Sequence, residues 1–261
     1  MFEANELLFD DGRFPKRTGP QLNDGVFKPP SIKLRVEQIL RMQGYKDLSR
    51  VRSEILTIAE SMTALAERTF EPAVDFRRVH LKDLSGDVLV LESGIKLYSK
   101  AFDKYISGCH EVAVFVMTLG SPLDEIERDL VKSDKIVETV FLETAGWLGI
   151  EQLTKLFSAF LRSLLASEGL RLGRRMSPGY AFRVGRAVCD WSLEDQKPIF
   201  DLFDKRNLAV ELLDSCAMSP KMSRSGLYGL FPETKFAQQP DAKSRTNRSG
   251  NARTIGSENK K

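Results

Sequence analysis

The stretch EVAVFVMTLG, residues 111–120, is the strongest strand candidate in the chain, and its surroundings decide the fold class. Its valines and phenylalanine are residue types that pack well on a pleated sheet. Ser121 and Pro122 follow directly and predict the start of a helix, because proline is favoured in a first helical turn. The apolar run within the stretch, Val112–Met117, is far shorter than the roughly 20 residues that span a bilayer. We therefore expect a buried strand and no membrane segment.

Both sides of this strand carry further short strands and longer helices. Strand-like segments occur at 76–82, 87–93, 207–213 and 224–231. Helical periodicity covers 31–44, where Ser31 is the expected N-cap, as well as 48–69, 94–107, 135–167 and a segment after Ser192. Strand and helix do not alternate regularly, which predicts an α+β domain with a mixed or antiparallel sheet.

Composition divides the chain into three parts. Residues 1–30 are rich in Gly, Pro and Asp and are expected to form an irregular lead-in, residues 31–232 a single domain, and residues 233–261 a disordered polar tail. The tail holds seven Lys or Arg and three Asp or Glu, a contribution of +4, so the rest of the chain is close to −1 although the whole is +3. A basic tail on a nearly neutral body argues against nucleic-acid binding by the folded part.

Few residues suggest a metal or a catalytic group. Cys109, Cys189 and Cys216 are scattered, as is typical of reduced thiols in a cytoplasmic protein, and the N-terminus lacks the pattern of a secretion signal. His80 and His110 have no ligand at metal-binding spacing. The chain has neither a GxGxxG motif after a strand nor a phosphate-binding loop. We assign no metal ligand and no catalytic residue.

The stretch RRMSPGYAF, residues 174–182, allows two interpretations. Pro178 and Gly179 are a common turn signal, because proline presets φ and glycine accepts a positive φ. The stretch is then an ordinary turn with basic flanks. Alternatively, the turn and its arginines form a cradle for a small zwitterionic ligand.

Two further segments are equally open. Glu151 either forms an exposed ion pair with Lys155, one turn later, or faces a site that the glycines at 146 and 149 allow a ligand to approach. The segment SCAMSPKMSRSGLYGLFP, residues 215–232, is either a turn leading into an edge strand weakened by glycine or the wall of a pocket.

Together and in this order, these segments resemble the reactivation domain of cobalamin-dependent methionine synthase, in its short free-standing form. The motif Arg-x-x-Pro-Gly-Tyr is matched by Arg175, Pro178, Gly179 and Tyr180. The motif Ser-x-Ala-Met-x-Pro-x-x-Ser-x-Ser-Gly-x-Tyr is matched without a gap by residues 215–228. LETAGWLGIEQLTKLF, residues 142–157, resembles the family's helix with a ligand-binding glutamate and places Glu151 on it. The likeness covers roughly residues 31–232.

The resemblance implies a C-shaped α+β domain with a twisted, mainly antiparallel sheet that binds S-adenosylmethionine in a shallow groove. Arg175 would pair with the ligand's carboxylate and Glu151 with its ammonium group, which suits a guanidinium and a carboxylate. The remaining residues of the implied site are Ser177, Gly179, Tyr180 and Tyr228. The chain departs from the family after Tyr180, where AFRVGRAVCDW replaces a shorter, proline-containing connection.

The resemblance also implies partners. The sequence has no Asp-x-His-x-x-Gly cobalamin motif, so cobalamin would enter only through a separate corrinoid protein. We expect a module that presents S-adenosylmethionine for reductive methylation of that protein's cobalt, with a flavodoxin-like reductant, in methionine biosynthesis or related corrinoid methyl transfer. The chain would be one component of a cobalamin-dependent methyltransferase system. The alternatives are a non-catalytic interaction protein that keeps the fold and binds another ligand, and, less favoured, nucleic-acid binding through the tail.

Overall fold

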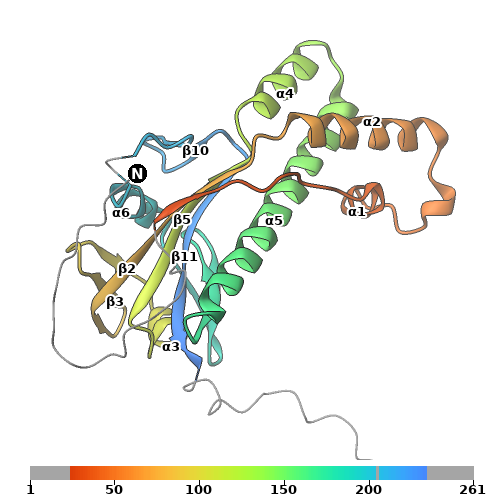
Figure 1. Ribbon diagram of the computed structural model, residues 1–261. Helices are drawn as coiled ribbons and strands as arrows, with labels where there is room; N and C mark the ends of the chain where they lie inside the picture. Colours follow the sequence, from red (N-terminus) through yellow and green to blue (C-terminus); the bar gives the residue numbers. More distant parts are fainter. Residues whose placement is uncertain (1–23, 204–205, 234–261) are drawn as a thin grey trace, which may run out of the picture.

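Strand β5 (Glu111–Thr118) lies in the interior of the main sheet, as expected for the apolar stretch around it. The computed structural model describes residues 24–203 and 206–233 (Figure 1). The strand order is β4-β3-β2-β5-β11-β6, β1 pairs with β2, and every pairing is antiparallel. The other strands of this sheet are β1 (Gly25–Phe27), β2 (Ala73–Ser85), β3 (Val88–Leu91), β4 (Lys96–Tyr98), β6 (Leu170–Met176) and β11 (Ser223–Pro232). The expected α+β class with a mainly antiparallel sheet is confirmed.

Helices cover both faces of the sheet. They are α1 (Val36–Met42), α2 (Ser53–Thr69), α3 (Phe102–Ile106), α4 (Pro122–Lys132), α5 (Ile136–Ala166) and α6 (Gln196–Asp201). The long helix α5 runs beside β5 and β11, while α1 and α2 extend away from the sheet (Figure 1). None of the helices in the described part of the chain is long and apolar enough to cross a bilayer.

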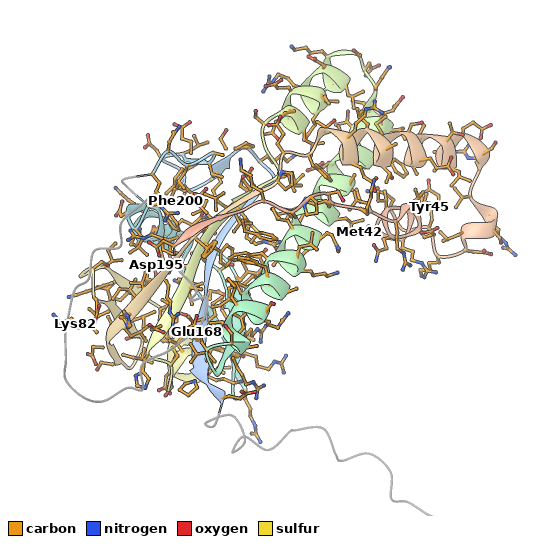
Figure 2. The ribbon with its side chains drawn as sticks, in the orientation of Figure 1. Met42, Tyr45, Lys82, Glu168, Asp195 and Phe200 are labelled. Carbon is orange, nitrogen blue, oxygen red and sulfur yellow. The ribbon has the colours of Figure 1, made fainter. Side chains whose placement is uncertain are left out.

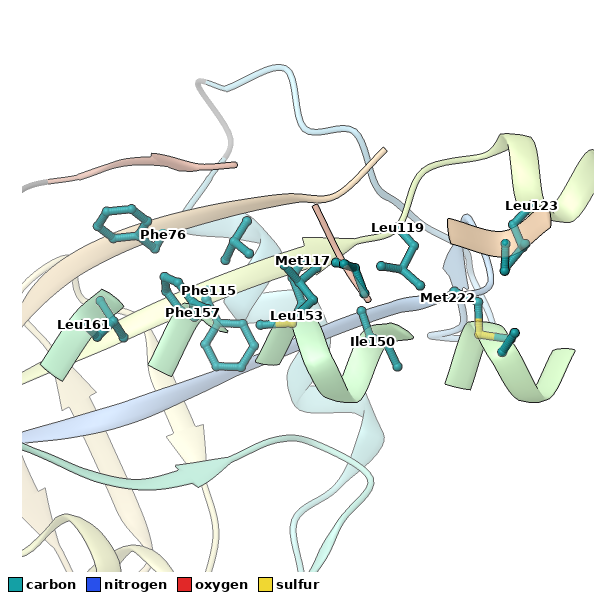
Figure 3. Close-up of a cluster of buried hydrophobic side chains, with 14 of the residues drawn as sticks. Phe76, Phe115, Met117, Leu119, Leu123, Ile150, Leu153, Phe157, Leu161 and Met222 are labelled. Carbon is teal, nitrogen blue, oxygen red and sulfur yellow. The ribbon is translucent and has the colours of Figure 1, made fainter. Parts of the chain in front are cut away.

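Two hydrophobic cores explain why β5 is apolar at every interior position. Phe115 and Met117 pack with Phe157 and Leu153 of α5 in the first core (Figure 3). The valines that alternate with them face the second core, which contains Trp191 and residues of α3 and α6. A strand covered on both faces does not alternate between apolar and polar residues. The buried run at 112–117 is therefore the signature of a sheet between two helical layers.

Two glycines bring α5 close to its neighbours. A Cβ on Gly149 would lie 2.7 Å from the ring of Phe70 and 2.8 Å from Leu119. A Cβ on Gly146 would lie 2.8 Å from Leu123 and 2.9 Å from the side chain of Met222. These glycines therefore serve helix packing, and the idea that they let a ligand approach Glu151 is wrong.

Several element boundaries differ from those expected. Ser31 is not a cap: α1 starts only at Val36, with Arg35 as its N-cap. The helix expected over 94–107 splits into β4 and the short α3, because Lys96–Tyr98 pairs with β3. Within 207–213 only β9 (Glu211–Leu212) forms, paired with β10 (Met218–Ser219).

The last strand of the chain is not the edge strand that one interpretation of residues 215–232 predicted. β11 is not at an edge, because it lies between β5 and β6. Its glycines fit crowded positions in the sheet: a Cβ on Gly226 would lie 2.3 Å from the carbonyl oxygen of Met176. Of the expected irregular lead-in at 1–30, residues 25–27 form β1, and residues 1–23 lie outside the described residues, as does all but the first residue of the tail.

Candidate functional site

The segment RRMSPGYAF ends strand β6 and forms a tight turn. The amide of Tyr180 donates to the carbonyl of Ser177 over 3.3 Å, and Gly179 has φ +79°. Proline at the second position and a glycine with positive φ at the third are the features of a type II turn. The amide of Gly179 donates to the carbonyl of Trp191 over 2.7 Å and ties the turn to the segment after it.

The chain between the turn and Trp191 is a β-hairpin, made by β7 (Ala181–Val184) and β8 (Ala187–Asp190). This hairpin comprises most of the stretch AFRVGRAVCDW, residues 181–191. At its end the buried indole of Trp191 donates to Asp195 over 2.6 Å, and the amide of Tyr98 donates to the same carboxylate oxygen over 2.7 Å. Asp195 lies next to α6 (Figure 2) and so joins the hairpin, α6 and β4.

A cleft of about 240 Å³ opens where the turn faces α5 and the start of β11. Trp147, Tyr180 and Leu193 are 49%, 39% and 43% exposed and form part of its rim. The lining residues are Trp147, Ile150, Ser177, Pro178, Gly179, Tyr180, Leu193, Gln196, Met218, Lys221, Met222, Ser223, Arg224 and Ser225. Segments far apart in the sequence thus meet at one place, and of the segment 215–232 it is Met218 and residues 221–225 that form a wall of this cleft.

Beside this cleft lie two buried polar atoms that have no hydrogen-bond partner among the described residues. They are Nη1 of Arg175 and Oγ of Ser177. The guanidinium of Arg175 lies 5.1 Å from the ring centre of Tyr180, within the range of a cation–π contact. An unsatisfied buried polar group costs about 1–3 kcal/mol. A ligand that offers an acceptor to both atoms would recover that free energy.

Glu151 has an unexpected partner. Its Oε1 accepts a hydrogen bond of 2.6 Å from Nη2 of Arg224, and Nη1 of the same arginine donates to Thr154 over 2.8 Å. Burial acts to raise the pKa of Glu151, but the hydrogen bond from Arg224 and the charges of Arg224, Arg175 and Lys155 outweigh it, so the pKa is lowered. Glu151 is therefore a carboxylate beside the cleft and not the partner of an exposed ion pair with Lys155.

The six residues of the implied site differ in their position relative to the cleft. Ser177, Gly179 and Tyr180 line it. Arg175 and Glu151 do not, but each contacts a residue that does: Arg175 contacts Tyr180, and Glu151 contacts Arg224.

Tyr228 lies apart from the others. Its side chain is 3% exposed, with its ring centre 5.4 Å from that of Phe115 and 6.3 Å from that of Phe157. Burial raises the pKa of Tyr228 to about 12. The structure therefore assigns Tyr228 to the hydrophobic core and not to the cleft wall.

Arg224 is the residue that reasoning from the sequence missed. It is 4% exposed, although it carries a charge, and its guanidinium lies 6.0 Å from the ring centre of Tyr180. The sequence does hold a signal: Arg224 shares its strand face with Met222 and Tyr228, because alternate residues of a strand point the same way. A single arginine between apolar residues on one buried face requires a partner, and Glu151 supplies it.

No group of three or more His, Cys, Asp or Glu side chains that could hold a metal ion occurs within residues 24–203 and 206–233.

No protein-family model matches the chain, and no curated protein matches it. Among solved structures, the chain is similar to the crystal structure of the MetH reactivation domain bound to AdoHcy, with a TM-score of 0.54 and 13% sequence identity. The match covers 87% of this chain and 84% of that chain. At this identity, the likeness shows a shared fold.

Proposed function

We propose that this chain binds S-adenosylmethionine in the cleft and acts as a free-standing reactivation-type module for a separate corrinoid protein. The fold supports this proposal, because the similar MetH domain has AdoHcy bound, a close analogue of S-adenosylmethionine. The position of the cleft supports it too, since the three segments that resemble the family in sequence meet there.

The unpartnered polar atoms of Arg175 and Ser177 carry the proposal. A methionyl group is a zwitterion, and its carboxylate needs donors while its ammonium needs an acceptor. Nη1 of Arg175 and Oγ of Ser177 are buried donors beside the cleft that have no partner among the described residues, and the ionised Glu151 nearby is an acceptor. The residues present therefore fit both charged ends of such a ligand.

The apolar parts of the cleft fit the remainder of the ligand. Trp147 and Tyr180 expose aromatic rings at the rim, and flat aromatic surfaces pack well against a purine. Bound S-adenosylmethionine would supply the methyl group that a corrinoid cobalt accepts after reduction. The side chains of this protein bind and orient the ligand at an open cleft, and they contribute positioning rather than acid–base chemistry. A flavodoxin-like reductant and a cytoplasmic setting complete the proposal.

Isothermal titration calorimetry of the purified chain with S-adenosylmethionine and with S-adenosylhomocysteine tests the function. We expect saturable binding of both ligands with Kd below about 1 mM, and no comparable binding of adenosine, which lacks the zwitterion. Absence of binding at millimolar ligand would refute this function and leave an interaction protein that has kept the fold.

A further inference from the structure

Arg224 lies on the interior strand β11, and its guanidinium is paired with the carboxylate of Glu151 beside the cleft. Its side chain is 5% exposed, whereas that of Glu151 is 46% exposed. The two terminal nitrogens of Arg224 both donate hydrogen bonds, Nη2 to Glu151 and Nη1 to Thr154 of α5. The arginine is therefore fixed between β11 and α5, and only its partner reaches solvent.

The pairing leaves half of the carboxylate available. Arg224 occupies Oε1 of Glu151, and Oε2 has no hydrogen-bond partner among the residues that the structure describes. The hydrogen bond to Oε1 restricts the rotation of the carboxylate and so favours one direction for Oε2. An acceptor of fixed direction and charge costs less free energy to use than one that must first be ordered.

The surroundings of Glu151 are strongly cationic. Arg224 of β11, Arg175 of β6 and Lys155 of α5 all lower its pKa. Tyr180 lies against the guanidiniums of Arg175 and Arg224, and both arginines also act to lower the pKa of the buried hydroxyl of Tyr228, although burial outweighs them.

We propose that Arg224 is a positioning residue, which holds Glu151 as an oriented carboxylate so that Oε2 receives the α-ammonium of the ligand. This inference rests on the proposed function and adds a residue to it. The lowered pKa of Glu151 agrees with the proposal, because the carboxylate then stays charged in mildly acidic solution.

A purely structural role for Arg224 makes a different prediction. An arginine that only joined β11 to α5 would, when replaced, disturb the whole cleft and weaken every ligand alike. A positioning role acts through Glu151 and so affects only ligands that have an ammonium group. Two ligands that differ in this group alone separate the roles.

The experiment compares S-adenosylhomocysteine with its desamino analogue, which lacks the α-amino group, by calorimetry on the wild type and on Arg224→Met. We expect Arg224→Met to weaken S-adenosylhomocysteine about tenfold or more at pH 7.5 and the analogue by less than about twofold, as for the loss of one charge-assisted contact. Arg224→Lys keeps the charge and should recover part of the affinity. Arg174→Met is the control, because Arg174 lies on the opposite face of β6 from Arg175 and donates to the hydroxyl of Tyr105; this variant should bind both ligands like the wild type.

A pH series gives a second readout. From pH 7.5 to 5.0 the wild-type affinity for S-adenosylhomocysteine should change less than about twofold, because the lowered pKa keeps Glu151 ionised. In Arg224→Met the pKa of Glu151 should rise, because the hydrogen bond and charge that lower it are lost. The affinity of this variant for S-adenosylhomocysteine should therefore fall about threefold more than that of the wild type between pH 7.5 and 5.0. The carboxyl resonance of Glu151, followed by NMR in the ligand-free variants, reports the same change without any ligand.

The outcomes distinguish the inference from the function on which it rests. If the wild type binds and Arg224→Met weakens both ligands equally, or if the carboxyl pKa of Glu151 is the same in both proteins, the positioning role is wrong and the proposed function stands. If the wild type binds neither ligand, the function itself fails, and the positioning role fails with it.

Discussion

Arg174 and Arg175 are adjacent in strand β6, and their side chains lie on opposite faces of it. The guanidinium of Arg174 is 5.1 Å from the ring centre of Tyr105 and 5.7 Å from that of Phe182, on the side of the hairpin. The guanidinium of Arg175 lies over Tyr180 instead. Neighbouring positions of one strand therefore place Arg174 against the hairpin side of the molecule and Arg175 beside the cleft.

This difference predicts unequal effects of two similar substitutions. Arg175→Ala should weaken S-adenosylmethionine binding by about 2–4 kcal/mol, roughly 30- to 1,000-fold, as for the loss of one partner of a desolvated charge pair. Arg174→Ala should change binding by less than about 0.5 kcal/mol. Arg175→Lys should recover only part of the loss, because an ammonium cannot form the bidentate pair of hydrogen bonds that a guanidinium forms with a carboxylate. Calorimetry on the three variants measures this, and equal losses from the two alanine variants would contradict the assignment.

Gly226 should be essential for the close contact between β11 and β6. A Cβ there would lie 2.3 Å from the carbonyl oxygen of Met176 and 2.6 Å from Oγ of Ser177, and a backbone atom cannot move away at small cost. We expect Gly226→Ala to lower the free energy of unfolding by about 3 kcal/mol or more.

Gly185→Ala is the control for this substitution. Gly185 has φ +60°, and no atom lies within 4 Å of the place that an added methyl group would take, so the substitution adds only backbone strain of roughly 1 kcal/mol. Urea denaturation compares the two variants. A smaller loss for Gly226→Ala than for Gly185→Ala would mean that the strands separate easily.

The buried guanidinium of Arg224 links the stability of the protein to Glu151. Glu151→Ala removes its acceptor and should destabilise the protein by about 1–3 kcal/mol, whereas the amide oxygen of Glu151→Gln still accepts and should limit the loss. The pKa of Glu151 is lowered in the folded protein, so its ionic contribution is fully present above its ordinary value of 4.5 and is lost as the pH falls through the lowered value. Unfolding curves should therefore show the wild type's advantage over Glu151→Gln as constant from pH 6 to 8 and shrinking below about 4.5. An advantage that grew on acidification would contradict the lowered pKa.

The three cysteines should react differently with a thiol reagent. Burial raises the pKa of Cys109 to about 12, so the thiolate that reacts is scarce at pH 8. Cys189 and Cys216 are partly exposed. We expect Ellman's reagent to modify Cys189 and Cys216 in the native protein and Cys109 only after unfolding. Rapid modification of Cys109 in the native state would show that the second core opens readily.

Local patterns predicted much of this fold because they do not depend on distant contacts. Pro122 marked the start of α4, the apolar run at 112–117 marked β5, and the Pro178–Gly179 pair marked a turn. Each of these signals acts through backbone geometry or burial of the residues themselves.

The features that escaped prediction depend on contacts between distant segments. Arg224 and Glu151 are 73 residues apart, so spacing along the sequence favoured Lys155 as the partner of Glu151. Tyr228 matches a family motif, yet its ring lies in the core because α5 covers that face of β11. A sequence pattern places a residue on one face of an element, but the packing of the elements decides what that face meets.

The interior position of β11 affects how the sheet can form while the chain is being synthesised. Of the described strands of the main sheet, β11 is synthesised last, after both of its neighbours β5 and β6. Until residues 223–232 have emerged, the nascent chain carries two facing strand edges with unpaired backbone groups, which are prone to wrong association. The cleft wall contributed by residues 218–225 is also missing until then. A product of interrupted translation that stops short of β11 therefore lacks both the strand that joins β5 to β6 and one wall of the cleft, and we expect it to associate wrongly more readily than the finished molecule.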